Sequence, residues 1–109
     1  MNLRLACFLG ALALLLTGCK EEPVPGLPPA LAEVDVSSCV ACHGRDGISP
    51  VPNYPNLAGQ KYAYLLSSLR QYQNEYRPHP VMGPIVAGMD DARLQELARY
   101  YAEIDPCPK

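Results

Sequence analysis

Cys39-Val40-Ala41-Cys42-His43 is the stretch of this chain that decides its fold. Its two cysteines are three positions apart, which places them on one face of a helical turn, and a histidine follows the second cysteine directly. This spacing is typical of covalent haem attachment, in which both thiols bond to the porphyrin and the adjacent imidazole lies beneath the iron. The motif predicts one haem c, with Cys39 and Cys42 as its thioether residues and His43 as an axial ligand of the iron.

Two other kinds of site use a CxxC pair, but each requires a context that this sequence lacks. A structural zinc site needs about four ligands, and beyond the motif the chain after residue 19 offers only His79 and Cys107, without a second CxxC. A thioredoxin-like redox pair requires a βαβ pattern, and the sequence has no run of alternating strands. The motif therefore favours haem over zinc or dithiol chemistry.

The first residues have the pattern of an export signal that ends in a lipidation site. Arg4 provides a short positive region, and residues 5–16 form an apolar run that is short for a transmembrane helix. The sequence LTGC at residues 16–19 then resembles a bacterial lipobox. We expect residues 1–18 to be a lipoprotein signal peptide and Cys19 to become the acylated N-terminus. An ordinary signal peptide cut nearby is the alternative, and an uncleaved anchor helix is a third.

A proline-rich stretch follows the predicted lipid. Residues 19–29 contain several prolines and little periodic pattern, which predicts an extended, lipidated tether of roughly 3.1 Å per residue. The protein would then be exported and held at the periplasmic side of a bacterial membrane by its N-terminal lipid. Lys20 follows Cys19 where an aspartate would favour the inner membrane, so the outer membrane is preferred.

The length and composition suit one small domain whose apolar core is too small to be stable without a further stabilising group. The chain has 109 residues, with 11 acidic side chains against 9 Lys and Arg, so no basic face for nucleic acid is expected. A domain this short has a limited apolar core and often needs a metal, disulfides or a cofactor. Cys107 has no obvious partner, and an unreactive residue in the C-terminal tail is preferred to an intermolecular disulfide.

Hydrophobic spacing predicts an all-α domain over residues 30–109, with three main helices. Their expected bounds are about Ala30 into the haem motif, about Gln60 to about Asn74, and Asp90 or Asp91 to Asp105. Apolar side chains recur at three- and four-residue steps from Tyr62 to Tyr72 and from Leu94 to Ile104, which is typical of amphipathic helices. An acid at the start of the third helix can cap its free amides.

Two segments rich in proline and glycine, residues 44–59 and 75–89, separate these helices. Such sequences disfavour helix, and loops of this length in a small domain are usually functional or disordered. Long loops wrapped around one covalently bound haem would explain both segments.

A second axial ligand is expected from the later segment, where Met82, Met89 and His79 are the candidates. A thioether favours reduced iron and raises the potential, whereas a second imidazole would lower it. Met82 lies between Pro80 and Pro84 in a stretch that we expect to be non-helical, whereas Met89 has the position of a core residue. We predict Met82 as the ligand, with His79 as the alternative.

With these residues identified, the chain resembles the class I c-type cytochromes, in particular the branch of cytochromes c4, c5 and c553. The resemblance covers about Ser38 to Glu103. The stretches that carry it are residues 39–47 (CVACHGRDG), residues 52–60 (PNYPNLAGQ), residues 64–65, Arg77, Met82, residues 90–91 and residues 97–101. Diheme members of the family repeat the domain, whereas this chain has one attachment motif.

The resemblance implies the small class I cytochrome c fold, in which the helix with the attachment motif crosses the C-terminal helix near Tyr100 or Tyr101. It places the distal methionine at Met82. It also implies a proline carbonyl that accepts a hydrogen bond from the proximal imidazole. Pro52 is the predicted residue, with Pro50 or Pro55 as alternatives.

An iron with both axial positions filled has no open site for a small-molecule substrate, so we expect a single-electron carrier and not an enzyme. Its partners would be redox proteins that dock transiently near the exposed haem edge, with small interfaces. The alternative is a haem sensor or peroxidase-like enzyme with an open or labile distal site, which would need a polar distal group such as His79 or Tyr76.

Overall fold

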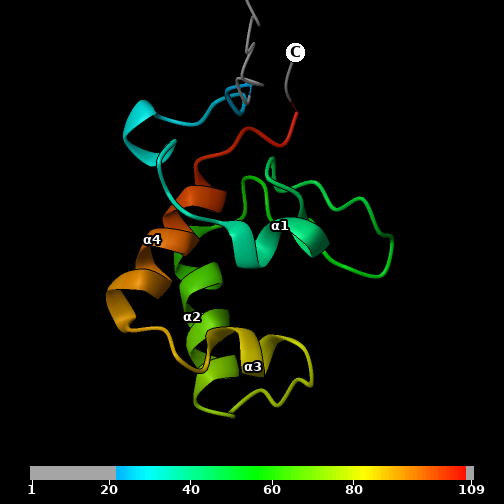
Figure 1. The fold of residues 1–109 in the computed structure, drawn as a ribbon, viewed down its shortest axis with the longest axis vertical. Helices are drawn as coiled ribbons and strands as arrows, with labels where there is room; N and C mark the ends of the chain where they lie inside the picture. The colour runs from blue at the N-terminus through cyan, green and yellow to red at the C-terminus, as the bar shows by residue number, and fades with distance from the viewer. Residues whose placement is uncertain (1–21, 108–109) are drawn as a thin grey trace, which may run out of the picture.

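The computed structural model describes residues 22–107, and within them every regular element is helical. In chain order the elements are the 3-10 turn η1 (Pro29–Leu31) and the helices α1 (Ser37–His43), α2 (Tyr62–Gln73), α3 (Met82–Val86) and α4 (Asp91–Ala102). The expected all-α fold is confirmed (Figure 1). The predicted signal peptide, residues 1–18, and the predicted lipidation residue Cys19 lie outside the described residues.

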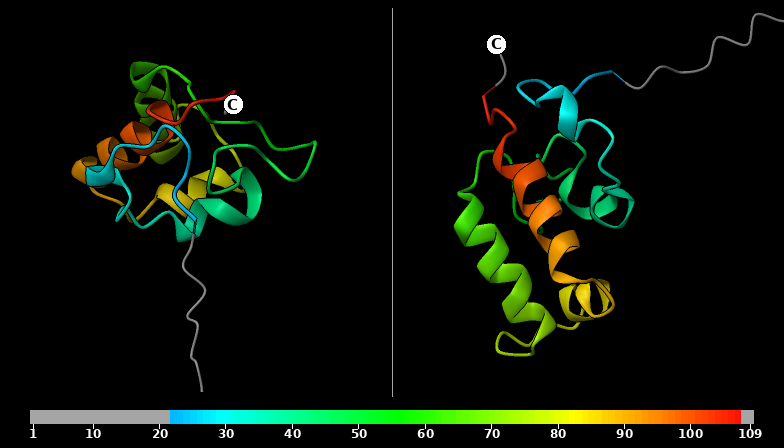
Figure 2. Two further views of the ribbon diagram at one scale, coloured as in Figure 1. Left: turned by 90° about the horizontal axis from the view of Figure 1, so that it is seen from above. Right: turned by 90° about the vertical axis from the view of Figure 1, so that its left-hand side faces the viewer.

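Helices α2 and α4 form the centre of the fold. They run side by side in Figure 2, and α3 packs against α2 at one end of the pair. The buried side chains of this scaffold are Leu65 and Leu66 from α2 and Leu94, Leu97, Ala98, Tyr100 and Tyr101 from α4. At its surface Arg70 pairs with Asp91 at 2.7 Å and holds the pKa of that carboxyl below its usual value. The α2–α4 pair therefore provides a rigid support for the shorter helices.

The bounds predicted for α2 and α4 are confirmed to within a few residues. Helix α4 begins where an acidic cap was expected, because Asp90 Oδ1 accepts a hydrogen bond from the amide of Arg93 at 2.8 Å. Helix α2 ends at Gln73, one residue before the predicted limit. In both helices the apolar spacing located the element, and the acidic cap gave the start of α4.

The prediction of one continuous first helix from Ala30 is wrong. The chain makes the short turn η1 and then runs without helix to α1, which begins only at Ser37. Val34 and Val36 are both buried. In a helix these two side chains would point in widely different directions, and the non-helical path between η1 and α1 buries both. Arg93 of α4 donates to the carbonyl of Asp35 and fixes this segment to the scaffold.

The segment around Met82 also differs from the prediction, because Met82 begins the helix α3 and does not lie in a non-helical loop. Pro84 is the third residue of α3. Proline is tolerated in the first turn of a helix, where its missing N–H leaves no hydrogen bond unmade. The two prolines therefore limit the length of α3 without excluding it.

Two tyrosines join the end of α1 to α4. Tyr100 donates its hydroxyl hydrogen to the carbonyl of Arg45 (2.9 Å), and Tyr101 donates to the carbonyl of Gly44 (3.1 Å). Gly44 has a φ of +77°, and a Cβ there would lie 2.3 Å from the carbonyl oxygen of Ile48, so only glycine fits this turn. The predicted meeting of the motif helix with α4 near Tyr100 and Tyr101 is observed, at the residues directly after α1.

The described part of the predicted tether is not wholly extended. Val24 and Leu27 are partly buried against the core, and the amide of Leu27 donates to the carbonyl of Val24. Gly26 lies beside Asp105, so both ends of the described chain lie at the same end of the molecule (Figure 1). Packing therefore begins before residue 30. Among residues 22–107, no helix is both long and apolar enough to cross a lipid bilayer.

Replacement of Tyr100 by phenylalanine is expected to lower the free energy of unfolding by about 1–2 kcal/mol, because the carbonyl of Arg45 loses its buried partner. Denaturant unfolding of the holoprotein measures this loss. Tyr76, which is 86% exposed, provides the control, since Tyr76→Phe should leave the midpoint unchanged. Equal midpoints for the two variants would contradict the bracing role of Tyr100.

Candidate haem site

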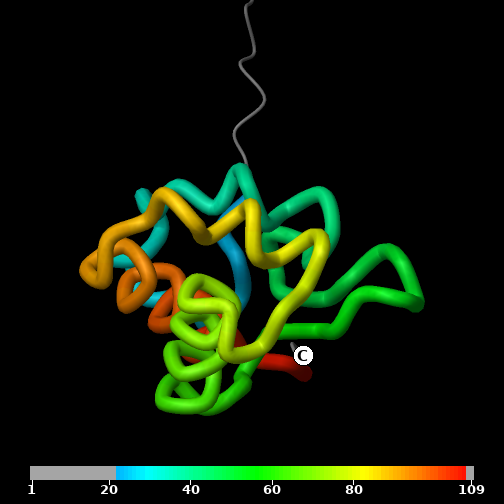
Figure 3. Tube along the Cα trace, turned by 90° about the horizontal axis from the view of Figure 1, so that it is seen from below, coloured from blue at the N-terminus to red at the C-terminus, as the bar shows by residue number. Residues whose placement is uncertain are grey.

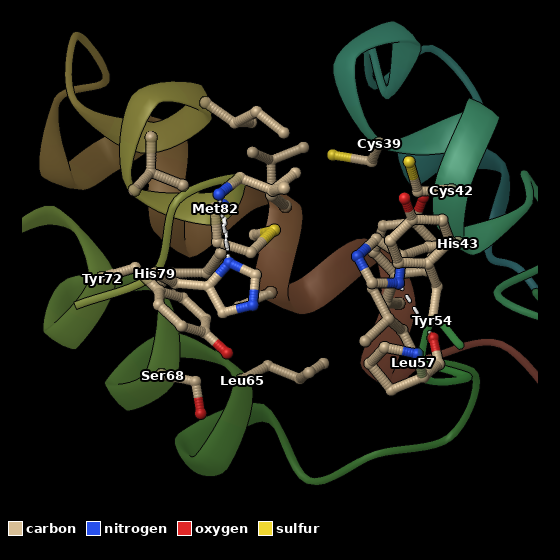
Figure 4. A pocket seen from close by; sticks show the side chains of 18 of the residues that line it. Cys39, Cys42, His43, Tyr54, Leu57, Leu65, Ser68, Tyr72, His79 and Met82 are labelled. Carbon is tan, nitrogen blue, oxygen red and sulfur yellow. Dashed lines mark hydrogen bonds between the residues drawn. The ribbon is translucent and has the colours of Figure 1, made fainter. Parts of the chain in front are cut away.

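A cavity of about 320 Å³ lies between α1, α2, α3 and the loop that follows α1. Figure 4 shows Cys39, Cys42 and His43 on one side of this cavity and Met82 on the other. Leu65 of α2 also lines it, and most of the lining is apolar. The structure therefore brings the four residues predicted from the sequence to one site, although α1 and α3 are far apart in the chain.

The two motif cysteines lie on α1 with free thiols. Both are partly buried and neither takes part in a disulfide. Burial raises the pKa of the Cys39 thiol, so this group stays protonated at neutral pH before any covalent bond forms. Both thiols are free and line the same cavity.

His43 is buried, with 7% of its surface exposed, and its ring is oriented by a proline carbonyl. Its Nδ1 lies 2.8 Å from the carbonyl oxygen of Pro55. Since Nδ1 donates to this carbonyl, Nε2 is the nitrogen left with a lone pair for a metal.

The prediction of Pro52 for this contact is wrong, and the alternative Pro55 takes its place. Pro52 lies in the exposed turn closed by the bond from the amide of Tyr54 to the carbonyl of Val51. Pro55 lies further along, where the chain returns toward the core and the amide of Leu57 donates to the carbonyl of Gly47. The hydrogen bonds that direct this return could not be identified from proline spacing alone.

Two polar residues without a recognisable sequence signal, Ser49 and Asn56, hold this loop. Ser49 donates its hydroxyl hydrogen to the carbonyl of Cys42 at 2.7 Å, and its amide donates to Asn56 Oδ1 at 2.7 Å. These bonds join the end of α1 to the chain just after Pro55. Serine and asparagine are common in loops for many reasons, so their type and position carried no specific signal.

On the opposite side Met82 is the first residue of α3 and is half-buried. His79 also lines the cavity, but its Nδ1 accepts hydrogen bonds from the amides of Val81 (3.2 Å) and Met82 (3.1 Å). Met89 also lines the cavity and is partly buried against the core. His79 was expected as an alternative ligand or as a polar distal group, and its contacts with the backbone were not predicted.

The other end of α3 is held by Gln73 of α2, whose Nε2 donates to the carbonyls of Val86 (2.9 Å) and Met89 (2.5 Å). A polar side chain at the end of an amphipathic helix is ordinary in a sequence. This contact could therefore not be recognised before the fold was known.

The donor set fits a haem c. Two free thiols adjoin a buried imidazole with one available nitrogen, a thioether faces them, and the space between is apolar. Within residues 22–107 no group of three or more His, Cys, Asp or Glu side chains is placed to hold a metal ion by itself. The described site therefore has the features of a macrocycle pocket and not those of a zinc centre.

Comparison with known proteins agrees with a site for covalently bound haem. The chain is 40% identical over 76 residues to cytochrome c-554(548) of Halomonas halodenitrificans, a match that covers 67% of this chain and 92% of the relative. It is 37% identical over 73 residues to cytochrome c4 of Pseudomonas aeruginosa, covering 67% of this chain and 36% of that protein. A solved structure of cytochrome c4 from Acidithiobacillus ferrooxidans superposes with a TM-score of 0.57 at 32% identity, covering 60% of this chain and 37% of that one. A search of protein-family models finds none that matches.

The chain belongs to the class I c-type cytochromes. Its haem is covalently bound, in agreement with its attachment motif, and it serves as an electron carrier. The chain spans nearly all of cytochrome c-554(548) but little more than a third of the cytochrome c4 chains that it matches.

Replacement of Ser49 by alanine is expected to destabilise the holoprotein by about 1–2 kcal/mol, because the carbonyl of Cys42 and the amide of Val51 both lose a partner. Guanidinium unfolding measures the change. Ser67→Ala serves as the control, since Ser67 is exposed on α2 and its hydroxyl accepts a hydrogen bond from Gln71 of the same helix. If the two variants unfold at the same midpoint, Ser49 does not brace the loop.

Proposed function

We propose that this protein carries single electrons on a haem held by thioether bonds to Cys39 and Cys42 and by axial bonds to His43 and Met82. The observation that supports this most strongly is the placement of both thiols and the imidazole on α1, across one apolar cavity from the methionine sulfur (Figure 4). When bound, the haem supplies the one-electron chemistry.

The chain's own residues set the properties of that centre. The carbonyl of Pro55 fixes the His43 ring and makes it a better donor. The apolar lining excludes water, and a thioether ligand favours reduced iron, so both raise the reduction potential. With imidazole and thioether in place, no axial position remains open. The proposal therefore assigns no small-molecule substrate and no enzymatic activity.

The contacts of His79 support Met82 as the distal ligand. Nδ1 of His79 accepts two amide hydrogens, so the neutral ring has its proton on Nε2. Binding of Nε2 to a metal would require the proton to move to Nδ1 and both amide bonds to break. Among residues 22–107 no hydrogen bond to the Met82 sulfur is present that iron would have to displace. The relatives named as cytochromes c do not favour the sensor or peroxidase-like alternative.

Redox proteins are the proposed partners, and the loop after α1 is the proposed docking surface. In Figures 1 and 3 this loop projects away from the α2–α4 pair. It exposes Ile48, Val51 and Tyr54, and it begins next to Cys42. Small apolar surfaces beside a redox centre suit the short-lived contacts of electron transfer, which lie at the low end of interface sizes.

Export and lipid anchoring complete the proposal. The apolar run of residues 5–16 and the lipobox ending at Cys19 support cleavage after residue 18 and acylation of Cys19. The carrier would then work on the periplasmic side, attached to a membrane through its lipid. Lys20 after the acylated cysteine supports the outer membrane.

Replacement of Met82 by alanine tests the ligand assignment. We expect loss of the weak far-red band of the oxidised protein, new binding of carbon monoxide by the reduced protein, and a fall in midpoint potential on the order of 100 mV, within the range that axial ligands span. Absorption spectra and redox titration measure all three. Met89→Leu is the matched control and should leave them unchanged. A spectrum and potential that survive Met82→Ala would exclude Met82, and ready carbon monoxide binding by the unaltered protein would favour the sensor or peroxidase-like alternative.

Replacement of Cys19 by serine tests the anchor. The change should abolish incorporation of labelled palmitate, because serine offers no thiol for acylation, whereas Cys107→Ser should incorporate it normally. Intact mass of the exported protein gives the same answer, since cleavage, acylation and haem addition each change the mass by a known amount. Labelling that persists in Cys19→Ser would contradict the lipoprotein assignment.

A further inference from the structure

Helix α3, which carries Met82, is too short to be stable by itself. It comprises five residues, Met82–Val86, and two of them are Gly83 and Pro84, the poorest helix formers. Forming the first turn of a helix is unfavourable even in a good sequence. The direction of the Met82 side chain therefore depends on groups outside α3 that hold its ends.

One residue, His79, accepts every amide hydrogen at the start of α3. Its Nδ1 accepts from the amides of Val81 (3.2 Å) and Met82 (3.1 Å), and its carbonyl accepts from the amide of Gly83 (3.1 Å). The next residue is Pro84, which has no N–H. The first turn of a helix normally leaves such groups without a partner. Here one side chain and its own carbonyl satisfy all of them.

The His79 ring is itself held by α2. The ring of Tyr72 meets it edge-on, with centroids 5.7 Å apart and planes at 73°. The guanidinium of Arg77 lies 4.9 Å from the centroid of the same tyrosine ring. Figure 4 shows His79 beside Tyr72, with its hydrogen bonds directed to the backbone at Met82. This packing keeps Nδ1 directed at the amides.

We propose that His79 is a positioning residue for Met82. Its ring nitrogen fixes the first turn of α3 and so holds the methionine sulfur toward the cavity, in the way that Asp90 caps α4. Without this acceptor the amides of Val81 and Met82 lose their partner, α3 opens more often, and the sulfur leaves its position more readily. The inference rests on the proposed role of Met82 as an iron ligand.

The test compares His79→Ala with His79→Asn in the oxidised holoprotein. Asparagine can present Oδ1 where histidine presents Nδ1, so it keeps an acceptor for the amides but cannot bind iron as an imidazole. The measurement is the apparent affinity for added imidazole, which must displace Met82, together with the far-red band. We expect His79→Ala to bind imidazole about tenfold more tightly than the unaltered protein, or about 1.4 kcal/mol, and His79→Asn to stay within about twofold of it.

Asp90→Ala is the matched control, because it removes a comparable cap from a helix that carries no iron ligand. It should lower the unfolding midpoint without changing the imidazole affinity. If His79→Ala does not accumulate, His79→Phe keeps a ring against Tyr72, removes the acceptor and should show the same tenfold effect.

The inference is overturned if His79→Ala and His79→Phe bind imidazole with the affinity of the unaltered protein. It is also overturned if the imidazole affinity of His79→Asn rises as much as theirs. Met82→Ala separates this failure from that of the proposed function. A far-red band that persists in Met82→Ala removes the ligand assignment itself. If Met82→Ala loses the far-red band as expected but His79→Ala keeps the imidazole affinity of the unaltered protein, only the positioning role is overturned.

Discussion

The described fold depends on holding an imidazole and a thioether on opposite sides of one apolar cavity. His43 ends α1 and Met82 begins α3, and both helices are too short to persist alone. Each proposed ligand is therefore held by contacts from outside its own helix. The carbonyl of Pro55 holds His43, and His79 caps the turn that presents Met82.

The α2–α4 pair supplies the rigidity that these short helices lack. Tyr100 and Tyr101 reach from α4 to the residues directly after α1, and Gln73 reaches from α2 to the end of α3. Burial of the Tyr101 hydroxyl raises its pKa, so it remains a hydrogen-bond donor at any ordinary pH. Side chains of α2 and α4 thus fix the backbone at the ends of the shorter helices α1 and α3. This arrangement suits a carrier, because ligands that move little between oxidation states allow rapid electron transfer.

The parts of this structure that sequence could predict are those with a repeated or chemically specific pattern. The apolar steps of α2 and α4 defined both helices, and the CxxCH motif defined the thiols and the imidazole as neighbours. The place of Met82 at the cavity was predictable because few residues in the chain can bind iron and the resemblance to known cytochromes indicated this position. Each of these signals depends on residue type at a local spacing, which a sequence displays directly.

The remaining features depend on contacts between distant segments. Val34 and Val36 interrupt the expected first helix because both are drawn into the core, and nothing in their local sequence forbade a helix. Pro55 rather than Pro52 faces His43 because Ser49 and Asn56 direct the path of the loop. The capping role of His79 was hidden because a histidine close to Met82, in a chain with a haem motif, is more readily interpreted as a ligand.

The most direct test of this account is a proton NMR spectrum of the reduced holoprotein with methyl-labelled methionine. A thioether bound to haem iron lies over the porphyrin face, where the ring current moves its methyl resonance far upfield. The account predicts one such resonance, assigned to Met82 by its loss on substitution, with Met89 in the normal range. A spectrum without an upfield methionine methyl, or one in which it belongs to Met89, would contradict the arrangement of His43 and Met82 across the cavity.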